Sequence, residues 1–373
     1  MADDVRHILA LSQINGLGPV GIRNLVGRLT AEGVFGSSDE ELGRCGLSAT
    51  TIGALRDGEK RAYAFADREI DKAEKEGARL YAFTDQDFPR RMASETSAPL
   101  VLYYRGSTSL DTAKTLAVVG TRRPTDDGRN ICDKIVGELC RLHPDLLIIS
   151  GLAYGIDIVA HRSALAAGRN TVAVMATGLD TIYPSQHRET AKRIEGQGAI
   201  VTEFAYGTPP EAYNFVSRNR IIAMLSDAVL VVESGLKGGS LITAKDAQEM
   251  SRRLFSVPGF PGRQMSMGCN ALIKSGQASM VECADDIDKA MGWSHLAMRR
   301  QPKQDKAPTL FPEPQDEKQK AIVAALQVED CLNASQICER VGIPPAQVNA
   351  TLLQMEFAGI VRSLPGNEYK LMI

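Results

Sequence analysis

The sequence contains no run of about 18 apolar residues, the length that a membrane-spanning helix needs. Its first residues, MADDVRHILALSQ, carry acids where a secretory signal has a basic stretch. The seven cysteines form no C-x-x-C pair, and the five histidines are scattered without metal-ligand spacing. These absences argue against both a disulfide framework and a structural zinc site. We therefore expect a cytoplasmic chain with free thiols, no metal and no membrane partner.

An excess of charge of one sign is also missing. The 43 Lys and Arg residues are balanced by 45 Asp and Glu residues, and neither 1–84 nor 85–295 is basic overall. This balance argues against a broad cationic surface, so we expect any binding of nucleic acid to depend on a local cluster of Arg side chains and backbone N–H groups. The length of 373 residues and the hydrophobic fraction of 44% are typical of two or three folded domains.

The composition changes most sharply around 296–315, which is rich in Pro, Gln and charged residues and lacks an apolar period. This pattern predicts a linker. After it, Glu317–Gln327, Ala334–Val341 and Pro344–Phe357 have helical periodicity, and the end of the chain alternates around a PGN turn. Three helices followed by a hairpin predict a winged-helix domain over 316–373. The helix 344–357 contains no Lys or Arg, so we expect this domain to bind protein, or DNA only weakly.

Residues 1–84 are helical in pattern and contain INGLGPVGIRNLVGRL at 14–29. The glycines at 16 and 18 open a helix, as in a helix-hairpin-helix motif, where such a turn exposes N–H groups to one phosphate. A tight turn between two small helices uses glycine in the same way, and the sequence does not decide between these interpretations. We predict a small helix-hairpin-helix or SAM-like domain over 1–84.

Between these ends, β-branched apolar runs alternate with stretches of helix length. The runs are TLAVVG (115–120), LLIIS (146–150), TVAVMA (171–176), AIVTE (199–203), AVLVVE (228–233) and LFSVPG (254–259). Such alternation predicts an α/β fold with a mostly parallel, doubly wound sheet and helices on both faces. We assign 85–295 to this Rossmann-like domain.

Four of the predicted strands end in Gly-rich turns: GTRRPT, SGLAYGID, TGLD and ESGLKGGSLITA. Ligands of open parallel sheets bind beyond these carboxyl ends, where glycine allows close approach and a following helix directs its N–H groups at an anion. Four such turns at one edge predict a phosphate-binding crevice. The candidate residues on the turns are Gly120, Thr121, Arg122, Arg123, Ser150, Gly151, Ala153, Gly155, Gly178, Gly239 and Ser240, with Lys237 as a further cation.

The fingerprints of common cofactors and hydrolases are missing from these turns. There is no G-x-G-x-x-G, no P-loop and no G-x-S-x-G elbow, so we expect no cofactor and no catalytic residue. Asp157 and His161 are four residues apart on one predicted helix and are expected to form a local pair. Glu203 and Glu233 end two strands, and we expect each to orient an Arg side chain.

The stretch 214–234 adds a second cluster. Arg218, Asn219 and Arg220 come just before an apolar helix predicted at 221–225, and an Arg fork suits phosphate oxygens. Three aromatic residues nearby, Phe204, Phe215 and Tyr183, offer stacking faces for bases or, equally well, side chains for the core.

The order of motifs resembles the DNA-processing protein A family, also called DprA or Smf. The matching segments are VVGTRRPT, SGLAYGIDIVAH, ATGLDTIYP, VTEF, FVSRNRIIAMLSDAVLVVES, GGSLITA, VPG and GCNALIKSGQA, in this order from 118 to 278. The resemblance implies a non-catalytic protein that binds single-stranded DNA, protects it, helps to load the RecA recombinase in natural transformation or recombination, and works as a homodimer.

The resemblance also implies roles for single residues. Gly120, Thr121 and Arg122 match the main phosphate-holding turn of the family. Some members carry a DNA-contacting Lys after the Tyr-Pro of the third turn. This chain has Ser185, Gln186 and His187 there, so Arg188 or Lys192 would have to replace that contact. Lys274 is another candidate contact. For the dimer, the sequence offers 241–250 and 265–273 without separating interface from core.

One alternative belongs to another class of function. The fold of the family resembles enzymes that bind nucleotides and cleave the N-glycosidic bond of nucleoside monophosphates, with a catalytic Glu in a P-G-G-x-G-T-x-x-E turn. The corresponding stretch here, KGGSLITAKDA, has no Glu at that spacing. The missing carboxylate favours a binding protein over an enzyme.

Overall fold

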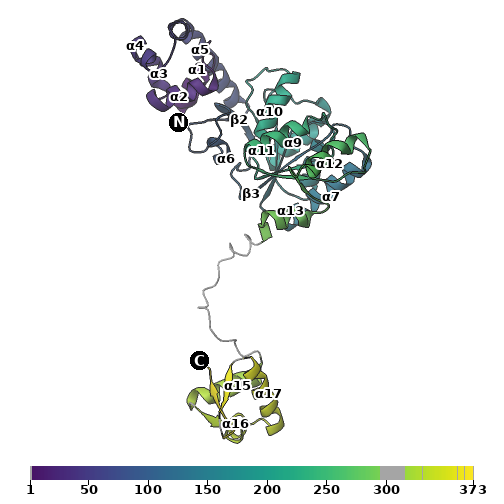
Figure 1. The fold of residues 1–373 in the computed structure, drawn as a ribbon. Helices are drawn as coiled ribbons and strands as arrows, with labels where there is room; N and C mark the ends of the chain where they lie inside the picture. Colours follow the sequence, from purple (N-terminus) through teal and green to yellow (C-terminus); the bar gives the residue numbers. More distant parts are fainter. Residues whose placement is uncertain (1, 295–315, 330, 359, 365, 373) are drawn as a thin grey trace. The chain divides into compact units, whose positions relative to one another are not determined.

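A computed structural model describes residues 2–294, 316–329, 331–358, 360–364 and 366–372. The chain divides into two compact units, Met1–Leu296 and Ala297–Ile373 (Figure 1). The predicted linker at 296–315 lies outside the described residues. No helix in the described ranges is long and apolar enough to cross a membrane.

The first unit begins with five helices: α1 (Ala2–Leu11), α2 (Pro19–Leu29), α3 (Ala31–Gly36), α4 (Asp39–Arg44) and α5 (Ala49–Lys75). Short polar side chains start three of them, because Thr30, Ser38 and Ser48 each accept a hydrogen bond from the amide three residues ahead. Buried aliphatic residues such as Ile8, Leu42 and Leu55 form the core of this segment. The predicted helical character of the N-terminal region is confirmed.

Nine strands in the described part of this unit form one sheet, in the order β1-β2-β6-β5-β4-β3-β7-β8-β9. The strands are β1 (Arg79–Ala82), β2 (Val101–Gly106), β3 (Lys114–Val119), β4 (Leu146–Ser150), β5 (Thr171–Val174), β6 (Ala199–Thr202), β7 (Ala228–Val231), β8 (Arg253–Ser256) and β9 (Ser279–Met280). The pairs from β6 through β9 are parallel, whereas β1 and β2 pair antiparallel at one edge. The six predicted strands and the mostly parallel sheet are confirmed.

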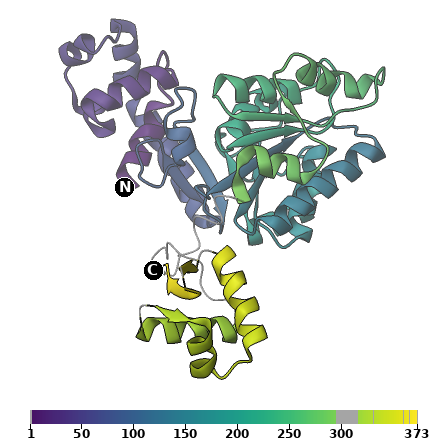
Figure 2. The ribbon, with the colours of Figure 1, turned by 60° about the horizontal axis from the view of Figure 1, so that its bottom comes forward.

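Strands β1, β2 and β9 were not predicted. β1 places Arg79 opposite Tyr104 of β2, so a strand that precedes residue 84 already belongs to the sheet. The helices at the N-terminus and the sheet therefore share one compact unit, with the helices at the β1 and β2 end (Figure 2). The domain boundary predicted at residue 84 falls after this shared strand.

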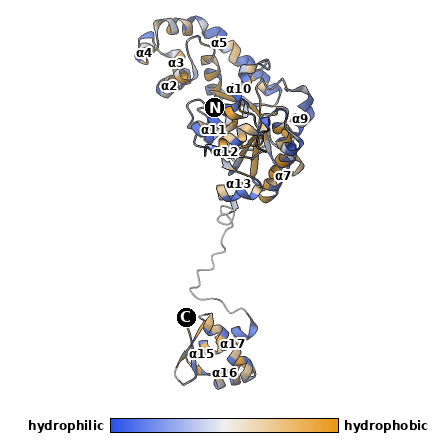
Figure 3. Ribbon diagram, turned by 45° about the vertical axis from the view of Figure 1, so that its right-hand side comes forward, coloured by the Kyte–Doolittle hydropathy of each residue, from blue (hydrophilic) through white to orange (hydrophobic). Residues whose placement is uncertain are grey.

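Helices cover both faces of the sheet. They are α6 (Arg90–Ala93), α7 (Asp126–Leu142), α8 (Ile156–Ala166), α9 (Arg188–Gln197), α10 (Ala212–Met224), α11 (Ser240–Glu249), α12 (Met267–Lys274) and α13 (Ala284–Met291), with 3-10 turns at Ser185–His187 and Gln264–Ser266. Leu116 and Val118 of β3 pack in one layer with α7, α8 and α13, whereas Ala117 and Val119 pack in the other with α10, α11 and α12. Figure 3 shows the hydrophobic strands between these two layers.

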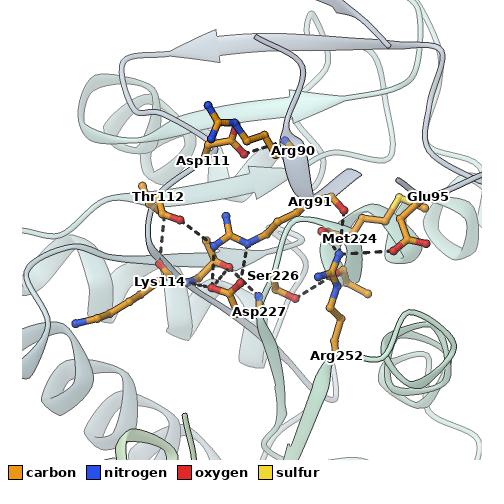
Figure 4. Close-up of polar contacts among 12 residues, drawn as sticks. Arg90, Arg91, Glu95, Asp111, Thr112, Lys114, Met224, Ser226, Asp227 and Arg252 are labelled. Carbon is orange, nitrogen blue, oxygen red and sulfur yellow. Dashed lines mark hydrogen bonds and ion pairs between the residues drawn. The ribbon is translucent and has the colours of Figure 1, made fainter. Parts of the chain in front are cut away.

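A polar cluster fastens the α6 segment to the sheet (Figure 4). The guanidinium of Arg91 donates to both carboxylate oxygens of Asp227, at 2.7 and 2.9 Å. Asp227 also accepts hydrogen bonds from the amide and the hydroxyl of Thr115 on β3, at 2.9 and 3.0 Å. Arg252 reaches the carbonyl oxygen of Arg91 at 2.9 Å. One carboxylate thus joins three segments that are far apart in the sequence.

The second unit contains α15 (Glu317–Val328), β10 (Leu332–Asn333), α16 (Ala334–Val341), α17 (Pro345–Phe357), β11 (Val361–Leu364) and β12 (Glu368–Leu371). The three predicted helices and the final hairpin are confirmed, and the short β10 was not predicted. Its strands pair in the order β10-β12-β11 against a core that includes Ile322, Ile337 and Leu352. This is the winged-helix arrangement.

Candidate nucleic-acid interface

The strand order of the sheet changes direction at β3, which is its topological switch point. The chain adds β4, β5 and β6 on one side of β3 and then places β7, β8 and β9 on the other. In open α/β sheets the ligand crevice lies at the carboxyl ends of the strands at this point. The residues that follow β3, β4 and β7 are therefore the ones positioned to line a site.

A cavity of about 520 Å³ lies there and gathers several of the predicted residues. It is lined by the exit of β3, the exit of β4, the middle of α10 and the start of α11. The predicted residues in its lining are Gly120, Thr121, Arg122, Ala153, Arg218, Asn219, Gly239 and Ser240. Arg123, Ser150, Gly151, Gly155, Gly178 and Arg220 do not line it.

Arg122 is the exposed cation of this cavity. Its side chain forms no hydrogen bond or ion pair with any residue that the structure describes, and its guanidinium carbon lies 4.9 Å from the centre of the Phe215 ring. The Phe215 ring lies 5.4 Å from that of Tyr183, whose side chain is also exposed. The cavity thus combines an unpaired cation with two neighbouring aromatic rings, whereas Phe204 lies outside its lining.

Arg218 has a different role from the one predicted. Helix α10 begins at Ala212, so Arg218 lies in the middle of a helix instead of before one. It is buried, and its guanidinium donates to the carbonyl oxygens of Gly151, which follows β4, and of Val174, which ends β5. Burial lowers the pKa of Arg218 to about 10, which leaves it charged at neutral pH. The sequence prediction of a phosphate-holding fork is therefore corrected for Arg218: the fork holds backbone carbonyl groups and places a positive charge in the cavity floor.

Arg220 lies on α10 two residues after Arg218, and its guanidinium forms an ion pair with Glu203, which follows β6. Glu203 therefore orients an Arg side chain, as predicted. The prediction was wrong for Glu233, whose Oε2 accepts hydrogen bonds from the amide and hydroxyl of Thr125 at 2.9 and 3.3 Å. Glu233 fixes the start of α7 instead of an Arg.

Two glycines of the second turn allow it to pack closely against the first turn and against Arg218 of α10. Gly155 has φ +84°, and a Cβ atom there would lie 2.1 Å from the carbonyl oxygen of Thr121. A Cβ atom at Gly151 would lie 2.4 Å from the Arg218 guanidinium. Packing within the protein therefore requires both glycines, whether or not a ligand approaches them.

The protein itself uses several of the amides predicted to hold phosphate. The Thr121 amide donates to the Glu233 carbonyl oxygen at 2.7 Å, and the Ala153 amide donates to Asp157 at 3.4 Å. The Ser150 hydroxyl donates to the Val118 carbonyl oxygen at 2.6 Å. Within the described ranges, the amides of Arg122 and Gly155 have no such acceptor. Of these two residues only Arg122 lines the cavity, so its amide and its side chain are available to an anion there.

Asp157 and His161 do not form the predicted pair. His161 is fully buried, and its Nδ1 bonds the Thr171 hydroxyl at 2.7 Å. Burial lowers its pKa to about 3, so His161 is neutral at physiological pH. Burial also raises the pKa of Asp157, an effect that the nearby Arg218 opposes. Among the described residues, no group of His, Cys, Asp and Glu side chains is arranged to hold a metal ion, and all seven cysteines are free thiols.

The other predicted cations lie outside the main cavity. Lys237 lines a neighbouring cavity of about 490 Å³ that shares Thr121 and Gly238 with the first. Arg188 and Lys192 line a separate cavity of about 290 Å³. Lys274 ends α12 and lines none of these three.

Three exposed residues near the cavity were not predicted. Tyr154 lies in the second Gly-rich turn and donates its hydroxyl to Gln186 at 2.7 Å. Tyr213 and Val216 lie on α10, where Val216 lines the cavity and Tyr213 is 77% exposed. An aromatic residue inside the turn SGLAYGID was the available signal for Tyr154. Tyr213 and Val216 could be placed beside the cavity only if the helix predicted at 221–225 had been extended back to Ala212, where α10 begins.

Residues 79–292 match the family model described as DNA recombination-mediator protein A, and residues 304–367 match that of the DprA winged helix domain. The first match alone covers more than half of the chain. The chain belongs to the DprA/Smf family.

Curated DprA/Smf proteins are similar over most of the chain. Protein Smf of Synechocystis sp. is 34% identical, with 97% of each chain covered. The DNA processing protein DprA of Streptococcus pneumoniae is 36% identical over 56% of this chain and 72% of its own. Family membership therefore makes this chain a DNA-processing protein of the DprA type.

Solved DprA structures share the fold. The X-ray structure of DprA from Streptococcus pneumoniae superposes with a TM-score of 0.66 at 30% identity, covering 76% of this chain and 96% of that one. A structure of DNA processing protein A from Helicobacter pylori, described as giving insight into its single-stranded DNA binding mode, has a TM-score of 0.53 at 29% identity. It covers 58% of this chain and 96% of that one.

Proposed function

We propose that this protein binds single-stranded DNA at the cavity between the β3, β4 and β7 exits, and that Arg122 contacts the phosphate backbone. The observation that carries the proposal is the exposed Arg122 guanidinium beside Phe215, without a partner among the described residues. A guanidinium suits phosphate oxygens, and aromatic faces stack on bases of any sequence. A Helicobacter pylori relative described as binding single-stranded DNA supports the same ligand.

The arrangement favours backbone contact over recognition of sequence. The guanidinium and the free amide of Arg122 are donors suited to phosphate, and Tyr183 and Phe215 offer ring faces without a fixed pattern of donors and acceptors. Binding is therefore expected to vary little with base sequence and to weaken steeply with salt.

A salt titration of Arg122→Ala tests the proposal. Binding to a labelled single strand is measured across a range of salt concentrations. The variant is expected to bind all sequences more weakly than the wild type, by a similar factor. The slope of log Kd plotted against log salt concentration should decrease by about 0.7, the value for one lost phosphate contact on a single strand. An unchanged slope would refute a direct contact.

The control is Arg141→Ala. Arg141 is also exposed, but it lies in the last turn of α7, whose first turn is at the strand-exit edge. Both variants remove one exposed positive charge, so a difference between them reports the position of the charge. Equal weakening by both variants would indicate a general effect of net charge and contradict the proposed site.

In the cell, we infer that the protein acts without catalysis: it protects single strands, helps to load RecA and works as a homodimer in transformation or recombination. Membership of the DprA/Smf family supports this role. Addition of the protein should increase the rate at which RecA assembles on single strands, and Arg122→Ala should reduce this effect. Release of free base from nucleoside monophosphates by the purified protein would favour an enzyme instead.

A further inference from the structure

Helix α17 of the second unit is apolar on two opposite faces. Its inner face packs Val348, Thr351, Leu352 and Met355 into the core. On the outer side, Ala346, Ala350, Leu353 and Phe357 are exposed, and Phe357 is 87% exposed. Their spacing of four, three and four residues places them in one stripe along the helix. An apolar stripe on the exposed side of a helix is normally covered by another element.

The charge of α17 excludes DNA as the cover. The helix contains no Lys or Arg, and its single acid, Glu356, accepts hydrogen bonds from the amide and hydroxyl of Ser363 at 3.2 and 2.5 Å. Phosphate contacts need cations, and the corresponding helix of a duplex-binding winged helix lies in the major groove. The exposed stripe therefore suits an apolar, uncharged surface.

The sizes of the side chains indicate which surface fits. The two small residues, Ala346 and Ala350, lie in the first half of the stripe, and the two large ones, Leu353 and Phe357, lie in the second half. Ala346 and Phe357 are equally far from the middle of the stripe, and so are Ala350 and Leu353. An antiparallel second copy of α17 places each large side chain against a small one, whereas a parallel copy opposes Phe357 to Phe357.

We propose that two copies of this protein pair through α17, antiparallel about a twofold axis between residues 350 and 353. A symmetric interface must be complementary to itself, and this stripe meets that condition in size. The α17 side chains beside it, Gln347, Asn349 and Gln354, are neutral. Lys318 donates to Gln347 at 3.0 Å, and an antiparallel pair places the two copies of Gln347 at opposite ends, so it does not bring these ammonium groups together. The pairing is independent of the DNA site in the first unit.

The interface is small. Two helices of 13 residues each bury less than the roughly 1,200 Å² at which stable protein–protein interfaces begin, so the pairing is reversible and depends on concentration. The paired fraction is largest where copies of the protein are already close together, for example when neighbouring copies are bound to one DNA strand.

Disulfide trapping in the full chain tests the register. Full-length Ala350→Cys and Leu353→Cys proteins are prepared, one of them carrying a tag that changes its mass. Each protein is oxidised alone, and a mixture of the two is oxidised in parallel. The antiparallel pair predicts a disulfide between Cys at 350 and Cys at 353 in the mixture, identified by mass spectrometry of the linked peptides. Wild-type protein under the same conditions gives the background from the native cysteines. A 350–350 or 353–353 disulfide as the main product indicates a parallel pair and overturns the proposal.

Sedimentation of full-length variants tests the association itself. Leu353→Glu is expected to weaken it at least tenfold, whereas Leu142→Glu, at an equally exposed Leu on α7 of the first unit, is expected to leave it unchanged. The exchange of sizes in Ala350→Leu/Leu353→Ala should restore association that either single change weakens. Circular dichroism checks that every variant is folded. If the wild type and Leu353→Glu associate equally strongly, the proposal is wrong. It is also wrong if the folded wild-type chain does not self-associate and α17 binds a different protein instead.

Discussion

Gly155 shows that a glycine in a ligand-binding turn can be required by packing alone. Its φ is +84°, and a Cβ atom there would approach the Thr121 carbonyl oxygen to 2.1 Å, which leaves no room for a side chain. Gly155→Ala is expected to lower the free energy of unfolding by more than about 2 kcal/mol, because backbone strain and a clash add together. Urea unfolding measures this loss.

Gly168 provides the matched control for this substitution. It also has a positive φ, +67°, but no atom lies within 4 Å of a Cβ placed there. Gly168→Ala is therefore expected to cost only the backbone term, about 1 kcal/mol. Equal losses in the two variants would contradict the account of Gly155 as a contact between two turns.

Asp227 carries more stability than its partial exposure suggests. It receives two hydrogen bonds from Arg91 and two from Thr115, so Asp227→Asn replaces an acceptor by a donor that faces other donors. We expect a loss of about 2 kcal/mol in the free energy of unfolding, measured with urea. Asp111→Asn is the control. Its Oδ1 accepts a hydrogen bond from the Arg90 amide at 3.0 Å, which an Asn oxygen can also accept, and the ion pair it loses is to an Arg90 side chain that lies 3.9 Å away and is 89% exposed (Figure 4). A larger loss at Asp111 than at Asp227 would contradict this view.

On the scale of elements, one ion pair connects α5 to the turn after β5. Asp180 accepts hydrogen bonds from the Lys72 ammonium at 2.6 Å and from the Gly207 amide at 3.0 Å. Burial alone would raise the pKa of Asp180, but these hydrogen bonds outweigh burial and lower the pKa below its ordinary value of 3.8. The carboxylate therefore stabilises the fold above pH 3.8, and this contribution is lost as the pH falls through the lower pKa of the folded state.

Urea unfolding between pH 5 and pH 2.5 checks the sign. The difference in stability between the wild type and Asp180→Asn should be largest at pH 5 and should shrink as the pH falls. Asp57→Asn removes an exposed carboxylate of α5 that has no hydrogen bond or ion pair among the described residues, and it should follow the wild type at every pH. A difference for Asp180→Asn that grows toward low pH would show that the sign is wrong.

The elements that the sequence predicts best are those with a strong local pattern. The β3, β4 and β7 runs are β-branched and buried on both faces, and Ala334–Val341 matches α16 at both ends. β1 was missed because four residues that begin with an exposed Arg gain their strand character from pairing with β2. In the site, the turn with Arg122 was predicted from its glycine and charge. The burial of Arg218 depends on carbonyl groups far away in the sequence, which no local pattern reveals.

For the whole molecule, the two units allow the functions of the DNA site and of the winged helix to be separated. The proposed DNA contacts all lie between residues 119 and 243, within the first unit, and the second unit has its own core. Residues 316–373 contain five Lys or Arg and seven Asp or Glu, and α17 contains no cation. The second unit therefore offers no concentrated positive charge to a phosphate backbone.

A chain that ends at Ser294 should consequently bind a short single strand about as tightly as the full chain, as measured by fluorescence anisotropy at matched salt. A strand long enough for one copy only removes any contribution from pairing between copies, because pairing strengthens binding only where several copies share one strand. On longer strands the full chain is expected to bind more cooperatively than the shortened one. A large loss of affinity on the short strand would instead place a DNA contact in residues 295–373 and contradict the confinement of the site to the first unit.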